Sequence, residues 1–139
     1  MSRSLQVIPF LGMLLLAGCA TTTPANVVGP GTQLETRQIQ TREYDTLDKS
    51  MTMRSVIATL QDLGFTIDQA DADLGTMTAT RLHDYTMRMT VTVVERENNR
   101  ISVRANARIN EDSVTDAATY QDFFIVLDKA MFLTLHKVD

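Results

Sequence analysis

The chain has 139 residues, of which 44% are hydrophobic, a formal net charge of −4 at pH 7 and a single cysteine. This length and composition suit one globular domain and leave too little chain for a second core. The mildly acidic balance gives no reason to expect a nucleic-acid partner, and one cysteine excludes an intramolecular disulfide.

Residues 1–18 follow the order of a bacterial export signal. Arg3 supplies a positive charge, an apolar run from Leu5 to Leu16 comes next, and two small residues precede Cys19. The apolar run is shorter than the roughly 20 residues that a transmembrane helix needs. We therefore expect residues 1–18 to be removed as a signal peptide.

The tetrapeptide Leu16-Ala17-Gly18-Cys19 resembles the lipobox of bacterial lipoproteins. That resemblance implies lipidation of the Cys19 thiol, with Cys19 becoming the first residue of the mature chain. Each buried lipid CH₂ contributes about 0.8 kcal/mol, so three acyl chains hold a protein on a bilayer without a transmembrane segment. The alternative is an unpaired thiol in an ordinary secretory signal.

The position after the lipobox cysteine bears on location. Enteric-type bacteria use an aspartate there to keep a lipoprotein in the inner membrane, and this chain has Ala20. The resemblance therefore implies an outer-membrane lipoprotein that faces the periplasm. Cleavage also removes Arg3, which leaves 12 basic against 17 acidic side chains and a net charge of −5.

A tether and a first strand are expected next. Residues 19–35 are rich in Thr, Pro and Gly and show neither helical nor strand periodicity, which is typical of a flexible tether. A single domain then spans residues 36–139. Within it, weak alternation over residues 37–44, with Ile39 and Tyr44 as apolar positions, predicts the first strand.

Residues 47–63 predict a helix. Thr46 and Asp48 are possible N-terminal caps, and Gly64 is the residue type most often found just past a helix end. Apolar residues recur between them at helical spacing on one face. These residues are Met53, Val56, Ile57, Leu60 and Leu63.

Four strands in two hairpins are predicted after this helix. Apolar and polar residues alternate on both sides of an acidic turn at residues 71–75, and again over residues 85–93 and 101–109. A three-residue loop with Asn99 in the left-handed region would align the like faces of the second hairpin. That register places Arg88 opposite Arg108.

A second helix is predicted over residues 120–135, after a polar loop at residues 110–118. Its main stripe consists of Tyr120, Phe123, Phe124, Leu127, Ala130, Met131, Thr134 and Leu135. Four further apolar residues lie off that stripe: Ile125, Val126, Phe132 and Leu133. Either a curved sheet wraps this helix, which is the interpretation we favour, or the helix offers a surface to a partner.

These elements predict the fold class. One apolar face on each strand and two amphipathic helices imply an antiparallel sheet covered on one side. The prediction is a two-layer α+β sandwich with about five strands, two helices on one face, and the order β-α-β-β-β-β-α.

Three segments carry a family resemblance. They are Thr41-Arg42-Glu43-Tyr44-Asp45, Leu60-Gln61-Asp62-Leu63-Gly64-Phe65-Thr66-Ile67 with Asp73-Leu74-Gly75, and Tyr120-Gln121-Asp122-Phe123-Phe124. Together they resemble a group of small, mostly uncharacterised proteobacterial outer-membrane lipoproteins. The likeness covers residues 36–138, implies the same order of elements, and brings no catalytic residue with it. More distantly, the order of elements resembles the helix-grip domains of the C lipoprotein of the outer-membrane β-barrel assembly machine, which is a likeness of fold alone.

Metal and catalytic patterns are weak in this sequence. Asp71, Asp73 and Gly75 have ligand types suited to calcium, but the rest of a twelve-residue calcium loop is missing, and a hairpin turn explains them. His83 and His136 lack a second ligand at a zinc spacing. Asp84 follows His83 directly, and adjacent strand residues point to opposite faces. We expect no metal, no cofactor and no catalytic residue.

The polar face of the sheet is the candidate partner surface. Arg88, Arg104 and Arg108 project there among threonines, and two arginines directly opposite each other are unfavourable unless a negative group intervenes. Asp68 from a neighbouring strand, an acidic partner protein, a peptidoglycan carboxylate or a lipopolysaccharide phosphate would supply that charge. The alternative is an ordinary solvated face of β-forming residues.

The sequence favours a membrane-anchored envelope lipoprotein with a non-catalytic binding or scaffolding domain. A second hypothesis is a carrier of a small apolar ligand or lipid, held between the sheet and the closing helix, where methionines would make an adaptable lining. The alternative is that these methionines fill the core. An envelope hydrolase is a remote third hypothesis. The methionines are Met51, Met53, Met77, Met87, Met89 and Met131.

Overall fold

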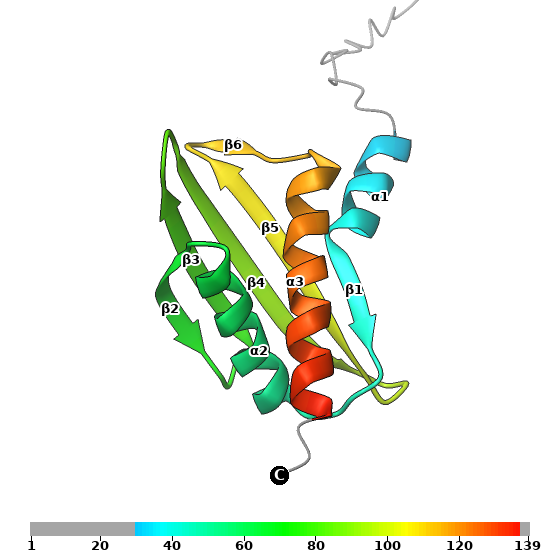
Figure 1. Cartoon of the computed structure of the whole chain (residues 1–139). Helices are drawn as coiled ribbons and strands as arrows, with labels where there is room; N and C mark the ends of the chain where they lie inside the picture. The colour runs from blue at the N-terminus through cyan, green and yellow to red at the C-terminus, as the bar shows by residue number, and fades with distance from the viewer. Residues whose placement is uncertain (1–29, 137–139) are drawn as a thin grey trace, which may run out of the picture.

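The computed structural model describes residues 30–136. The predicted signal peptide, Cys19 and the first part of the tether lie outside the described residues. The described part is an antiparallel sheet with helices packed on one face (Figure 1). The predicted two-layer α+β sandwich is therefore confirmed.

The elements follow one another as two helices around a short strand, a run of strands, and a long closing helix. The sheet order is β1-β5-β4-β3-β2, every pairing is antiparallel, and β6 adds a short strand beside β5. The elements are α1 (Pro30–Ile39), β1 (Thr41–Tyr44), α2 (Lys49–Asp62), β2 (Thr66–Asp71), β3 (Thr76–Leu82), β4 (Thr86–Arg96), β5 (Arg100–Ile109), β6 (Asp112–Ser113) and α3 (Ala117–Leu135).

The connections explain the helical layer. Strands β1 and β2 lie at opposite edges of the main sheet, so the segment between them has to cross the sheet, and α2 makes that crossing. The closing helix α3 returns over the same face beside α2 (Figure 1). Asp48, one of the two predicted caps, accepts a hydrogen bond from the Met51 backbone at 2.7 Å, and Gly64 follows the helix with φ of +83°.

The second hairpin has the predicted register. Asn99 adopts φ of +58°, and Arg88 pairs with Arg108 across β4 and β5. On these two strands and on β3, the residues of the opposite face point under the helices. They are Met77, Ala79, Met87, Met89, Val91, Val93, Ile101, Val103, Ala105 and Ala107, each 3% exposed or less. Tyr85, predicted to share that face, lies before the start of β4 and is 45% exposed.

The start of the domain differs from the prediction. Helix α1 covers residues 30–35, predicted as tether, and residues 37–39, predicted as the start of the first strand, so the first strand is only β1. Pro30 occupies the first helical position, where its missing N–H and fixed φ are favourable. Strong helix formers such as Gln33, Leu34 and Glu35 begin three residues later, and Ile39 packs against the core. The domain therefore contains three helices instead of two.

The hydroxyl of Tyr120 fills the gap along the edge of β5 between its pairing with β1 and its pairing with β6. It accepts hydrogen bonds from the Gln40 side chain and the Ala107 backbone N–H, both at 3.1 Å, and donates to the Val114 carbonyl at 2.7 Å. Ala107 lies between the part of β5 that pairs with β1 and the part that pairs with β6. This buried hydroxyl thus satisfies a backbone donor in the gap between two strand pairings.

Candidate binding surfaces

The closing helix α3 is covered by the domain on one side only. Its predicted stripe is largely buried, with Tyr120, Phe123 and Leu127 at 0% exposed. The interpretation that the sheet wraps the helix is wrong for most of the residues off that stripe. The sheet and α2 pack against one side of α3 and leave the opposite side uncovered. Off the stripe, Ile125 is 63%, Phe132 58% and Leu133 57% exposed. Leu135, which was predicted to lie on the buried stripe, is also 55% exposed, because it lies at the end of the helix.

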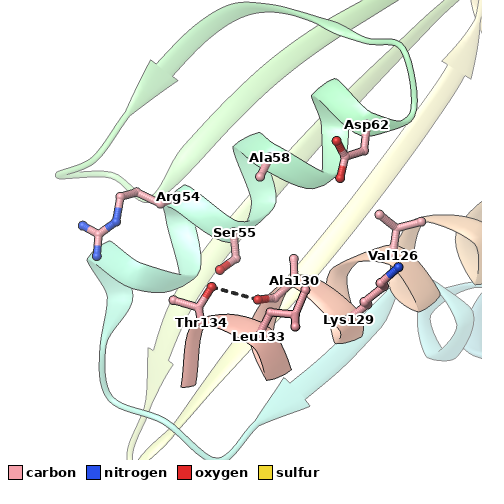
Figure 2. A pocket seen from close by; sticks show the side chains of 9 residues that line it. All are labelled: Arg54, Ser55, Ala58, Asp62, Val126, Lys129, Ala130, Leu133 and Thr134. Atoms are coloured by element: carbon pink, nitrogen blue, oxygen red, sulfur yellow. Dashed lines mark hydrogen bonds between the residues drawn. The ribbon is translucent and has the colours of Figure 1, made fainter. Parts of the chain in front are cut away.

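A groove separates the exposed sides of α2 and α3 (Figure 2). Its volume is about 540 Å³. Small side chains create it, because Ala58 on α2 faces Ala130 on α3 where larger residues would close the space. We call this the α2–α3 groove, lined by Arg54, Ser55, Ala58, Asp62, Val126, Lys129, Ala130, Leu133 and Thr134.

Ser55 lies on the inner wall of the α2–α3 groove with an unpaired hydroxyl. The residue is 4% exposed, and among the described residues its Oγ has no hydrogen-bond partner. Thr134 stands across from it in Figure 2, but the Thr134 hydroxyl donates to the Ala130 carbonyl of its own helix at 2.8 Å. A buried polar group without a partner costs about 1–3 kcal/mol.

The opposite face of the sheet carries the predicted arginines. Arg88, Arg104 and Arg108 are all exposed, and the structure adds Arg96 on β4 and Arg37 on α1 beside them. We call these five residues the arginine face. Arg37, Arg96 and Arg104 line a shallow hollow of about 330 Å³ that contains no acidic residue.

The arginines elsewhere in the domain have partners. Arg42 pairs with Asp128, and Arg100 pairs with Glu43 and Asp45. On the arginine face, four arginines make no hydrogen bond or ion pair within the described residues. They are Arg37, Arg88, Arg96 and Arg104, while the Arg108 guanidinium donates only to the backbone carbonyl of Glu111.

Asp68 does not neutralise this face. Its carboxylate accepts a hydrogen bond from the Thr80 hydroxyl at 2.6 Å, at a bulge in β2. Thr80 in turn pairs with Arg88 across β3 and β4, so Asp68 approaches the arginines without contacting one. The positive charges of the Arg88 and Arg108 pair are therefore not neutralised and remain exposed to solvent.

A further network joins β1 to α3 on the helical side of the sheet. Tyr44 donates a hydrogen bond to Asp128 at 2.8 Å, and Arg42 pairs with the same carboxylate while its guanidinium lies 4.8 Å from the centre of the Phe124 ring. Burial of the Tyr44 ring raises the pKa of its hydroxyl well above the ordinary value of about 10, and the hydrogen bond to Asp128 raises this pKa further. This network fixes the position of α3 on the sheet edge.

The weak metal and catalytic candidates stay apart. His83 and Asp84 are exposed in the bend before β4, and His136 stacks on Phe132 at the end of α3. Asp71 accepts a hydrogen bond from the Leu74 backbone, as expected of a hairpin turn. Within residues 30–136, no three acidic, histidine or cysteine side chains are placed to hold a metal ion.

The six methionines proposed as a ligand lining are core residues. Each is 6% exposed or less, which favours the interpretation that they fill the interior. Met87 and Met89 also border a hollow of about 260 Å³ near the start of α3. That volume is below the range of about 300–1,000 Å³ that is typical of small-molecule sites.

No protein-family model matches this chain, and no curated protein does. None of the helices in residues 30–136 combines the length and the apolar character that crossing a bilayer requires. The assignment of a function therefore depends on the two surfaces described above. Sequence reasoning found part of the arginine face and missed the α2–α3 groove, Arg37 and Arg96. Arg96 lies an even number of residues after Arg88, and residues at that spacing on one strand point to the same face, so the sequence could have placed Arg96 on this face.

Proposed function

We propose that the protein is a periplasm-facing outer-membrane lipoprotein, anchored through Cys19, whose domain is a non-catalytic binding module for another envelope protein. The helical face binds that partner. By the helical face we mean the α2–α3 groove and the exposed apolar residues of α3. The observation that supports this proposal is the exposure of Ile125, Phe132 and Leu133 beside a groove with an unpaired buried hydroxyl.

The shape and chemistry of the helical face suit an amphipathic helix from the partner. Grooves between two helices accept such a helix through apolar anchors spaced about one turn apart. Val126 and Leu133 supply apolar walls, and the small Ala58 and Ala130 allow close approach. Clustered exposed apolar side chains on a soluble domain are a mark of interaction surfaces.

Site-specific photo-crosslinking in intact cells tests the binding surface. A photoreactive residue at position 133 should give discrete crosslinks to an envelope protein, because Leu133 lines the groove. The matched control is position 82, because Leu82 is also apolar and 77% exposed but lies at the end of β3. Ala58→Trp should fill the groove and reduce the position-133 crosslinks about tenfold or more. Equal crosslinking from both positions would contradict the proposal.

A carrier of a small apolar ligand is a second candidate, but at a different site from the one expected from the sequence. The space between the sheet and the closing helix is filled by the core methionines, whereas the α2–α3 groove, with a volume of about 540 Å³, falls in the range of small-ligand sites. Native mass spectrometry of the purified protein separates the two. A stoichiometric apolar adduct that Ala58→Trp removes, together with no position-133 crosslink, would favour a carrier over a protein-binding module.

The lipid anchor has its own test. Metabolic labelling with a clickable palmitate analogue should label the wild type and leave Cys19→Ala unlabelled and unprocessed. Label that persists in Cys19→Ala would disprove acylation at this residue, whatever the crosslinking shows.

A further inference from the structure

We propose that the arginine face docks the domain on the anionic headgroups of the membrane that holds the lipid anchor. The first observation is a group of arginines that have no ion-pair partner. The chain carries 17 acidic against 13 basic side chains, so acidic partners for arginines are plentiful. Arg88, Arg96 and Arg104 nevertheless form no ion pair among the described residues and lie together on one face. Glutamates approach this face at one end only, where Arg96 also lines a hollow with Glu43, Glu95 and Glu97.

The second observation is the geometry of this face. Arg88 and Arg108 are directly opposite on neighbouring strands, which puts their Cβ atoms about 5 Å apart and is unfavourable without a nearby anion. Arg96 lies eight residues further along β4 than Arg88, about 26 Å away at the rise of a strand. Arginines spread over that length match an array of headgroups better than one small anion.

The third observation is where the chain enters the domain. Helix α1 begins at Pro30, and its Arg37 lines the same hollow as Arg96 and Arg104. The ten residues between Cys19 and Pro30 can span at most about 35 Å. A lipid on Cys19 therefore keeps the membrane within reach of this side of the domain. This step relies on the anchor in the proposed function, whereas the charge pattern does not.

Such docking would also orient the helical face. The helices cover one face of the sheet (Figure 1). The arginines belong to the alternate residues of the strands, which project from the other face. A domain that rests on the bilayer through its arginines presents the α2–α3 groove to the periplasm. Each arginine near an anionic bilayer surface adds a similar favourable amount to the free energy of binding, and salt screens this attraction.

Vesicle sedimentation of the mature chain, residues 19–139, carrying Cys19→Ser tests the docking without an acyl chain. It should bind phosphatidylcholine vesicles that contain phosphatidylglycerol, should not bind pure phosphatidylcholine vesicles, and should dissociate near 1 M salt, where the Debye length is about 3 Å. Arg88→Gln with Arg104→Gln should weaken binding about 30-fold, and Arg96→Gln alone about fivefold.

The control is Gln61→Glu with Gln121→Glu, which lowers the net charge by the same two units through exposed residues of α2 and α3. It should bind vesicles within about twofold of the unsubstituted chain. Equal weakening by both double variants would overturn the proposal, because net charge alone would then govern binding. Absence of phosphatidylglycerol dependence would overturn it too. Binding of soluble glycerol phosphate without vesicle binding would instead identify an isolated phosphate site. None of these results alters the test of Cys19 or of the helical face.

Discussion

The two faces of the sheet are built by alternate residues of the same strands, yet they differ completely in chemistry. On β5, Val103 and Ala105 are 0% exposed under the helices, while Arg104 between them is exposed and has no partner among the described residues. Burial of the inner face supplies the free energy of folding, because apolar area removed from water is the main favourable term. The outer face contributes little to folding, so its composition is free to serve binding.

The largest expected effect comes from a change on the inner side. Phe123→Ala should lower the free energy of unfolding by about 3–5 kcal/mol, because Phe123 is 0% exposed and its removal leaves a cavity. Urea denaturation measures this loss. Ile125→Ala, two residues along the same helix and 63% exposed, should change stability by less than about 0.5 kcal/mol. Similar losses in both variants would show that the outer side of α3 is covered in solution.

A smaller loss is expected when the apolar ring is kept and only its hydroxyl is removed. Tyr120→Phe should cost about 1–3 kcal/mol, because the Gln40 side chain and the Ala107 N–H lose their buried acceptor. Hydrogen exchange should also quicken at Ala107, which no strand pairing protects on that side. An unchanged exchange rate at Ala107 would contradict the assigned bond.

On the outer face, a substitution should increase stability. Arg88→Glu places a carboxylate opposite Arg108 and should raise the free energy of unfolding by about 0.2–1 kcal/mol, because it replaces a like-charge pair with an ion pair. The same variant should lose binding to anionic vesicles. Arg88→Gln should give a smaller stabilisation in the same denaturation assay. A loss of stability in both variants would mean that Arg88 makes a favourable contact in the folded domain.

The last prediction concerns pH and the network between the sheet and α3. Because the folded pKa of Tyr44 is raised, the folded state holds this proton more tightly than the unfolded chain does. The resulting stability is complete below about pH 10 and is lost as the pH rises above that value. Between about pH 9 and pH 11, urea midpoints should therefore fall more steeply for the wild type than for Tyr44→Phe. Parallel curves would contradict this assignment.

Strong local patterns made much of the fold predictable. The alternation through residues 85–93 and 101–109 and the position of Asn99 gave the correct hairpin register, since a shift of one residue would turn Arg88 and its neighbours into the core. The stripe on α2 predicted the burial of Met53, Val56 and Leu60, whereas Ile57 and Leu63 are only partly buried. Helix α1 was missed because Thr, Pro and Gly dominate the start of the predicted tether and mask the helix formers that follow Pro30.

The sequence by itself determined the alternation of the strands, the stripes of the helices and the placement of Arg88 opposite Arg108, because these depend on residues that are close in the chain or joined by one tight turn. Only the tertiary structure decided which apolar residues of α3 stay exposed, that Ala58 faces Ala130 across a groove, and that Arg37 joins Arg104. Those outcomes depend on how elements distant in sequence pack against one another, and no periodicity within a single element encodes that packing.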